Sequence, residues 1–165
     1  MAGKIHIQND GGVATLTIDN EEKRNALTLA MTRDALDAIR EMDADPAVRV
    51  VVITGAGTKA FCSGADISEF EKLRSDAEAS RRYVEEAAAF YETLKTLSKP
   101  TIARIAGSCM GGGVILAACC DLRVASEPVS FAITAAKLGI GFTFDFPRRL
   151  VELTGAARAK EILFT

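Results

Sequence analysis

The run Val48-Arg-Val-Val-Val-Ile53 constrains the fold of this chain more than any other segment. It is nearly continuous in β-branched residues, the pattern expected of a strand that is covered on both faces. Gly55-Ala-Gly57 follows it directly, and glycine allows a sharp turn at the end of a strand. We therefore expect a core strand that leads into a glycine-rich loop.

Strand and helix patterns alternate along the rest of the chain, so the predicted fold class is α/β with a coarse strand-strand-helix rhythm. Alternating apolar and polar residues on either side of Asp10-Gly-Gly12 predict a β-hairpin. The tyrosines fit core-facing helical stripes. The other predicted elements are a helix with the apolar stripe Leu29, Leu36 and Ile39 that ends near Asp45-Pro46; a long helix from the capping box Ser75-x-x-Glu78 to Lys99-Pro100; a strand over 101–106, a glycine-rich loop over 107–113, and an apolar helix over 114–120; strands over 121–125 and 129–133; and helices over roughly 145–153 and 156–164.

Composition excludes several classes of protein. A chain of 165 residues, 48% hydrophobic and 25% charged, can form one globular domain over 1–165 and is not disordered. The net charge of −2 gives no overall attraction to nucleic acid or an anionic membrane. The longest apolar stretch, 114–120, is far short of the roughly 20 residues that a membrane span needs.

The four cysteines indicate buried thiols, with no metal site and no disulfide framework. No pair has C-x-x-C spacing, and two of them are adjacent in an apolar run. We expect a reducing compartment, hence a cytoplasmic location. The cysteines are Cys62, Cys109, Cys119 and Cys120.

Two glycine-containing junctions between a strand and a helix carry the strongest chemical signal. They are Gly55 to Ile67 and Ala106 to Gly113. The N–H groups at the start of a helix are unpaired and lie at the positive end of its dipole, so two such junctions could direct donors at one oxyanion. The alternative is that both are only turns. Asp66 likewise has two interpretations, a contact to a ligand or the N-cap of a capping box with Glu69.

The order and spacing of four segments resemble the crotonase (enoyl-CoA hydratase/isomerase) superfamily. The resemblance covers essentially all 165 residues. It implies a spiral of strand-strand-helix units that binds an acyl-CoA thioester, with CoA present only as part of the substrate and no separate cofactor. The segments are Arg24-Asn-Ala-Leu27, Ala60-Phe-Cys-Ser-Gly-Ala-Asp-Ile67, Met110-Gly-Gly-Gly113 and Cys120-Asp121.

The resemblance also implies roles for particular residues. By position, the two oxyanion donors are the backbone N–H groups of Ala65 and Gly112. Members of the family normally continue into C-terminal helices that build trimers or hexamers. This chain ends in an apolar, helix-like segment, 159–165, without a capping glycine, so we expect a truncated C-terminal helical part and a homotrimer or hexamer. The implied substrate-binding and CoA-binding residues are Arg24, Ala26, Leu27, Ala65, Asp66, Ile67, Ser68, Gly111 and Gly112.

The sequence departs from the family pattern at two catalytic positions. Hydratases of the family use two glutamates, and the corresponding residues here are Ile115 and Ala135. Asp145 is the candidate replacement base, with helix N-cap as its alternative role. In that loop Phe142 and Thr143 stand where other members place an Asp or a Tyr, and Glu69 and Glu71 are weaker candidates that we expect to be solvated.

We therefore expect an acyl-CoA-processing enzyme, a lyase or isomerase of fatty acid metabolism. Because both glutamates are replaced, an acyl-CoA hydrolase or decarboxylase of the same fold is an alternative, and so is a protein that binds CoA thioesters with little catalysis.

Two other chemistries remain as competitors. Gly107-Ser-Cys109-Met-Gly111 fits a nucleophile elbow, although the only histidine, His6, precedes the cysteine and is expected to face solvent. Gly55-Ala-Gly57-Thr-Lys-Ala60 fits a dinucleotide-binding pattern, but the residues after it do not open a helix at once.

Overall fold

The computed structural model describes residues 3–139, 141 and 145–164, apart from the side chains of Leu138 and Asp145. In this part of the chain a six-stranded sheet has the order β1-β2-β3-β5-β4, and β6 also pairs with β5. Only the β1–β2 pair is antiparallel. The strands are β1 (Lys4–Asp10), β2 (Val13–Asp19), β3 (Val50–Gly55), β4 (Ala60–Cys62), β5 (Thr101–Met110) and β6 (Leu122–Ala132).

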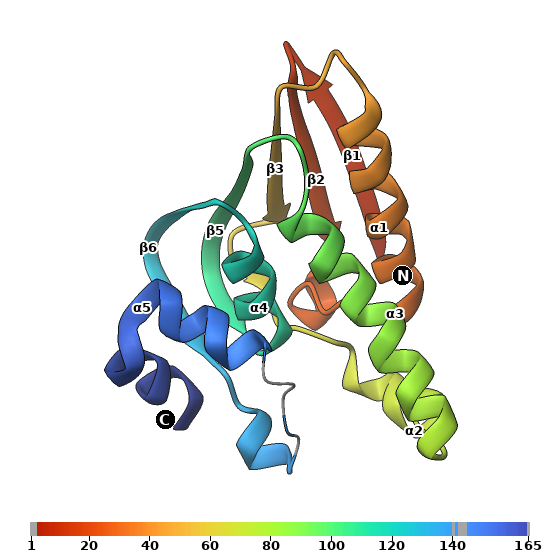
Figure 1. Ribbon diagram of the computed structural model, residues 1–165, viewed down its shortest axis with the longest axis vertical. Coiled ribbons are helices and arrows are strands. Elements are labelled where there is room, and N and C mark those ends of the chain that lie inside the picture. Colours follow the sequence, from red (N-terminus) through yellow and green to blue (C-terminus); the bar gives the residue numbers. More distant parts are fainter. Residues whose placement is uncertain (1–2, 140, 142–144, 165) are drawn as a thin grey trace.

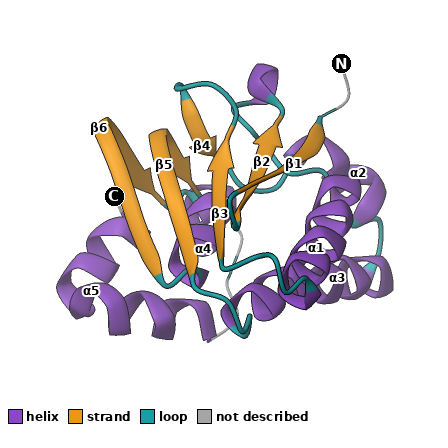
Figure 2. Cartoon of the chain, turned by 90° about the horizontal axis from the view of Figure 1, so that it is seen from above, coloured by secondary structure: helices purple, strands orange, loops and turns teal. Residues whose placement is uncertain are grey.

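The helices gather on one side of this sheet (Figures 1 and 2). In Figure 2 the strands stand in a row, and α1, α3, α4 and α5 lie below them. One face of the sheet therefore forms most of the core. The helices are α1 (Leu29–Ala44), α2 (Phe70–Leu73), α3 (Ala77–Lys95), α4 (Gly112–Cys119) and α5 (Asp145–Phe164), with short 3-10 turns η1 (Glu21–Lys23), η2 (Ile67–Glu69) and η3 (Ala135–Leu138).

The N-terminal hairpin is confirmed. Gly11 and Gly12 both have positive φ, 56° and 89°, so the chain reverses between Asp10 and Val13 and the two strands pair along their whole length. Thr28 then caps α1 by accepting a hydrogen bond from the Met31 N–H. The predicted end of this helix is also confirmed, because Asp45 is its C-cap.

Strand β3 is central, as predicted, but only one of its faces is fully covered. Val51 and Ile53 are buried, whereas Val50 and Val52 are half-buried. The physical reason is the one-sided arrangement of the helices: side chains alternate across a strand, so every second residue of β3 faces away from the helical layer.

Strand β5 is longer than the sequence predicted and organises the site. Its first half pairs with β3 and its second half with β4, while β6 runs along its other edge. The expected glycine-rich loop over 107–113 is thus wrong as far as Met110. Gly107 allows the strand to continue because a β-carbon there would lie 2.2 Å from the Lys59 carbonyl oxygen, a close approach that only glycine permits.

Several other predicted boundaries were wrong for local reasons. Asp76, and not Ser75, caps α3, because the Asp76 carboxylate accepts from the Ala79 N–H. That helix ends at Lys95, where Thr96 is the C-cap, before the predicted proline. The two strands predicted over 121–133 are one strand, β6, with a shift in its pairing register against β5. The two helices predicted over roughly 145–153 and 156–164, by contrast, are confirmed, because the non-helical Gly155 (φ 76°, ψ 160°) divides α5 into two helical segments.

Candidate active site

The two glycine junctions meet, backbone against backbone, beside the start of α4. A β-carbon on Gly64 would lie 2.6 Å from the Gly112 nitrogen, and one on Gly112 would lie 3.5 Å from the Ala65 nitrogen. Gly113 is equally crowded, since a β-carbon there would lie 2.1 Å from the Cys62 carbonyl oxygen. Glycine is required at Gly64 and Gly113, because a β-carbon at either one would collide with the backbone of the other junction.

The N–H groups of Ala65 and Gly112 have no hydrogen-bond acceptor within the described part of the chain. Gly112 is the first residue of α4, where N–H groups have no partner inside the helix. Ala65 and Leu27 form a parallel β-bridge. In it the Leu27 N–H donates to the Gly64 carbonyl, and the Leu27 carbonyl accepts from the Asp66 N–H. Since successive N–H groups of an extended chain alternate in direction, the Ala65 N–H points away from Leu27.

The segment from Arg24 to Leu27, which contains three of the binding candidates, lies against the first junction. The Leu27 N–H donates to the Gly64 carbonyl (2.8 Å), and the Arg24 carbonyl accepts from the Ser63 N–H (3.1 Å). Asn25 fixes this arrangement: its side-chain amide donates to the Ala56 and Ala60 carbonyls at 2.9 and 2.7 Å. Arg24 is exposed, whereas Ala26 and Leu27 are buried.

Asp66 is the N-cap of η2 and the centre of a polar cluster. Its carboxylate accepts from the Ser68 N–H and hydroxyl (3.0 and 2.6 Å) and from the Lys23 ammonium (2.7 Å). Burial alone would raise the pKa of Asp66, but the hydrogen bonds from Lys23 and Ser68 outweigh it and hold that pKa below its ordinary value. The predicted capping box is incomplete, because Glu69 instead accepts from the Leu29 N–H at the start of α1 (2.8 Å).

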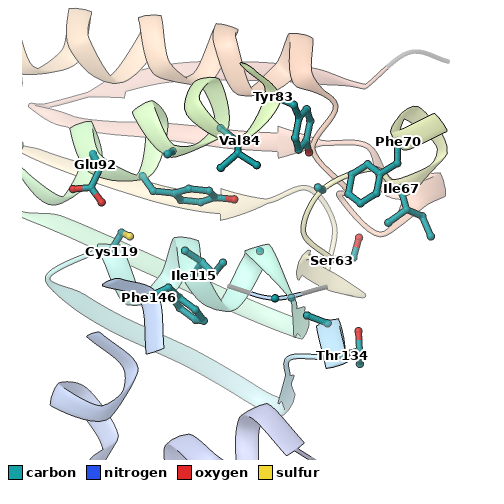
Figure 3. A pocket seen from close by; sticks show the side chains of 18 of the residues that line it. Ser63, Ile67, Phe70, Tyr83, Val84, Glu92, Ile115, Cys119, Thr134 and Phe146 are labelled. Carbon is teal, nitrogen blue, oxygen red and sulfur yellow. The ribbon is translucent and has the colours of Figure 1, made fainter. Parts of the chain in front are cut away.

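A largely apolar cavity of about 500 Å³ opens beside the two unpaired N–H groups. Its walls come from both junctions, α3, α4, η3 and α5. Ile115 and Phe146 face this space in Figure 3, with Ser63 and Thr134 at one end and Glu92 and Cys119 at the other. An extended apolar group could therefore lie along α4 with its polar end at the Ala65 and Gly112 nitrogens.

Tyr91 is a cavity residue that the sequence did not indicate as part of a site. The stripe pattern indicated a core side chain, and its ring does pack against buried Phe90, with centroids 5.6 Å apart. Its hydroxyl, however, lies 3.1 Å from the place of a β-carbon on Gly112. Helical periodicity could show only that Tyr91 faces inward. That its hydroxyl reaches the start of α4 depends on tertiary packing.

Carboxylates are scarce in this cavity. Ile115 and Ala135 both line it, and among the described lining residues Glu92 is the only acid. Glu92 pairs with Lys95 at 3.0 Å. Glu71 is exposed, as expected, while Glu69 is half-buried and holds α1. Phe142, Thr143 and the side chain of Asp145 lie outside the described residues, although the backbone of Asp145 begins α5.

The two competing chemistries do not fit the structure. Cys109 is fully buried within β5, and burial raises the pKa of its thiol, so it is neither exposed nor activated. His6 is exposed and pairs with Asp19 at 2.8 Å on the N-terminal hairpin. The segment after Gly57 enters strand β4 instead of a helix, so no helix N-terminus is available there for a pyrophosphate.

Two broader observations follow from the described residues. None of the helices in this part of the chain combines the length and apolar character that crossing a membrane requires. All four cysteines are free and buried, as predicted.

A sequence model of the family described as enoyl-CoA hydratase/isomerase matches residues 8–165. A crotonyl-CoA hydratase of Syntrophomonas wolfei is 34% identical over 161 residues, covering 98% of this chain and 61% of the relative. A peroxisomal Delta(3,5)-Delta(2,4)-dienoyl-CoA isomerase of Arabidopsis thaliana is 32% identical, with the same two coverages.

Among solved structures, a putative enoyl-CoA hydratase/isomerase family protein from Hyphomonas neptunium superimposes with a TM-score of 0.92. It is 36% identical, and the match covers 97% of this chain and 61% of that one. The chain thus spans about 61% of the length of these relatives.

Proposed function

The chain belongs to the enoyl-CoA hydratase/isomerase family and has its crotonase-type fold, and we propose that it binds an acyl-CoA and polarises its thioester carbonyl with the N–H groups of Ala65 and Gly112. The observation that carries this proposal is the meeting of two unpaired N–H groups at the wall of an apolar cavity.

The proposed chemistry follows from charge development. When a proton leaves the α-carbon of a thioester, or a nucleophile adds to the β-carbon, negative charge moves onto the carbonyl oxygen. Two fixed N–H donors, one of them at the positive end of the α4 dipole, stabilise that charge by roughly 3–4 kcal/mol each. The largely apolar walls around Ile115 lower the local polarity and strengthen the effect.

The reaction proposed first is hydration or isomerisation of an enoyl-CoA, since the relatives named above carry these activities. Asp145 is the proposed base, and Asp145→Asn tests it: unchanged turnover would remove it from the mechanism. The remaining binding roles, including those of Arg24, Asp66 and Ser68 toward CoA, belong to the same proposal.

A second candidate is favoured by one specific observation. Ile115 and Ala135 line the cavity and carry no proton, and the one acid among the described lining residues is paired with Lys95. Such a site suits thioester hydrolysis, decarboxylation or binding without turnover.

One panel of substrates separates these functions. Crotonyl-CoA is the substrate that tests hydration, and a 3-enoyl-CoA is the one that tests isomerisation. Saturated acyl-CoAs test hydrolysis, which releases free thiol, and a malonyl-type CoA tests decarboxylation. Product formation that saturates with substrate supports an enzyme, and its type identifies the reaction. Saturable binding without any product supports a binding protein, whereas no preference for acyl-CoA over free CoA contradicts the proposal.

Assembly into a homotrimer or hexamer is part of this proposal. It is supported by the large apolar side chains that β6 leaves exposed, among them Leu122 at 58% and Val124 at 60%. Sedimentation equilibrium tests it, and a monomer at micromolar concentration would count against it.

A further inference from the structure

The hydroxyl of Tyr91 lies beside the start of α4 at the cavity wall and makes no hydrogen bond within the described part of the chain. The Ser63 hydroxyl, which belongs to another lining residue, instead donates to the Lys23 carbonyl at 3.1 Å. Burial raises the pKa of Tyr91 well above its ordinary value, so the hydroxyl keeps its proton and can donate.

The position of this hydroxyl relates it directly to the two backbone donors. The Tyr91 oxygen lies 3.1 Å, and the Ala65 nitrogen 3.5 Å, from one and the same point, the place of a β-carbon on Gly112. That point is a single bond away from Gly112 itself. Three potential donors, from α3, the first junction and α4, therefore surround one small volume at the cavity wall.

The ring of Tyr91 is held where it is. It sits on α3 beside Phe90, which is fully buried, with ring centroids 5.6 Å apart and planes inclined by 42°. A hydroxyl on a fixed ring loses little freedom when it binds a ligand. An acyl group that filled the cavity without an acceptor for it would strand a buried donor, which disfavours binding.

We propose that the Tyr91 hydroxyl is a third hydrogen-bond donor to the thioester oxygen, beside the N–H groups of Ala65 and Gly112. This inference rests on the proposed function, since it requires an acyl-CoA in the cavity. The thioester oxygen then has three hydrogen-bond donors, and one of them is a side chain that can be replaced by mutation without changing the backbone. Tyr91 is then a substrate-binding residue, and removing its hydroxyl weakens thioester recognition without altering the glycine junctions.

The experiment compares two ligands that differ in one oxygen. Butyryl-CoA has the carbonyl oxygen, and the thioether S-butyl-CoA lacks it. Calorimetric titration gives the preference of the protein for the thioester over the thioether. In Tyr91→Phe we expect that preference to fall by roughly three- to tenfold, the usual loss for one neutral hydrogen bond. The affinity for the thioether should not fall, and it rises to the extent that the thioether leaves the wild-type hydroxyl without an acceptor.

Tyr83→Phe is the matched control, because it removes a hydroxyl from the same helix and the same cavity. Tyr83 packs edge-on against Phe70, 5.6 Å between centroids, at a different part of the wall (Figure 3). We expect this variant to keep the full thioester preference. Equal losses in the two variants would overturn the assignment to Tyr91.

The outcomes separate the inference from the proposed function. A wild-type protein that binds both ligands equally contradicts the two-amide site and Tyr91 together. A wild-type preference that survives intact in Tyr91→Phe leaves the amides in place and overturns the role of Tyr91.

A second measurement needs no variant at Tyr91. The chain has only two tyrosines, so protein labelled with ¹³C at tyrosine Cζ gives two resonances, assigned with Tyr83→Phe. We expect the Tyr91 resonance to shift on binding butyryl-CoA and much less on binding S-butyl-CoA. Equal shifts with both ligands would contradict the hydrogen bond.

Discussion

The backbone nitrogen of Gly112 lies 2.6 Å from the point that a β-carbon on Gly64 would occupy. Two segments that are 48 residues apart in the chain thus touch through their main chains. This contact fixes how far apart the Ala65 and Gly112 N–H groups lie, because Gly112 is part of the contact and Ala65 directly follows Gly64. The geometry of the site therefore depends first on the close contact of the two glycine-containing backbone segments, and only second on the side chains around them.

Gly64→Ala should damage both stability and ligand binding. The new methyl group meets the Gly112 backbone, and Gly64 has φ of 95°, which disfavours any L side chain. We expect the free energy of unfolding to fall by about 2–5 kcal/mol, as measured by urea denaturation. In the fraction that stays folded, the thioester preference should fall at least about tenfold, the loss expected when one oxyanion donor is misplaced.

Gly11→Ala is the control for the backbone strain alone. Gly11 also has positive φ, 56°, but a β-carbon there would meet nothing within 4 Å. Its cost should be only about 1–2 kcal/mol, with ligand binding unchanged. Equal losses of stability in the two variants would show that the contact between the junctions is unimportant.

The second prediction concerns the pH dependence of the Asp66 cluster. Asp66 caps η2 and bonds to Lys23 and Ser68, and its pKa is lower in the folded protein than in the unfolded chain. Its stabilising contribution is therefore complete above the unfolded pKa of about 3.9 and disappears as the pH falls through the lower, folded pKa. Asp66→Ala should cost about 1 kcal/mol at pH 7, the usual value of an N-cap, and progressively less below pH 4.

Urea denaturation of both proteins across this pH range provides the measurement. Asp37→Ala is the comparison, because Asp37 is exposed and its closest cation, Arg40, is 3.9 Å away. A difference between wild type and Asp66→Ala that does not shrink as the pH falls from 5 to 2.5 would contradict a role for the ionised carboxylate.

Local patterns in the sequence predicted the elements that are stabilised locally. The hairpin at Gly11-Gly12 and the apolar stripe of α1 are such cases, since a turn and a helical face are defined by near neighbours in the chain. The family motifs also brought Arg24 to Leu27 together with Ala65 to Ser68, because the bridge between Leu27 and Ala65 joins those segments. Residues 24–27 and 63–66 would not have been paired from periodicity alone.

The features that sequence reasoning missed depend on distant contacts. Strand β5 passes through Gly107 because the Lys59 carbonyl approaches it and accepts from the Ser108 N–H at 3.0 Å. No local sequence pattern predicts this contact, and Gly107 is therefore interpreted, from the sequence alone, as part of a loop. Tyr91 is similar, since its reach to α4 depends on how α3 packs. The half-exposed face of β3 likewise depends on which side the helices occupy.

Placing acids at two cavity positions is the third prediction. Ile115 and Ala135 both line the cavity, and we propose from the resemblance that they occupy the positions of two family glutamates. The double variant Ile115→Glu/Ala135→Glu should hydrate crotonyl-CoA at least about tenfold faster than wild type, since one positioned general acid or base is typically worth 10²–10⁴. Spectrophotometric loss of the conjugated thioester measures the rate.

The control replaces both residues with glutamine, which has nearly the same shape as glutamate but cannot act as a general acid or base. A glutamine pair that is as fast as the glutamate pair would show that general acid–base chemistry is not responsible for the gain. Both variants should be less stable than wild type, because each introduces polar groups into an apolar cavity.

The reactivity of the four thiols gives the last prediction, one that also reports on the cavity. Burial raises the pKa of Cys119 to about 11 and those of Cys62 and Cys120 to about 12, and it raises that of Cys109 as well. Only Cys119 lines the cavity. At pH 8 about one Cys119 in a thousand is a thiolate, so iodoacetamide should label Cys119 slowly and the other three more slowly still, as followed by mass spectrometry of peptides.

Ligand binding should lower the labelling rate of Cys119, whereas unfolding in urea should raise the labelling rates of all four thiols. Saturating butyryl-CoA should slow the labelling of Cys119, because an acyl chain that lies along α4 covers its thiol, whereas free CoA should protect it less. In urea all four thiols become equally accessible and should react at similar rates, which provides the reference. Labelling of Cys109 in the folded protein as fast as that of Cys119 would contradict its burial within β5, and unprotected Cys119 in the saturated complex would place the acyl chain elsewhere.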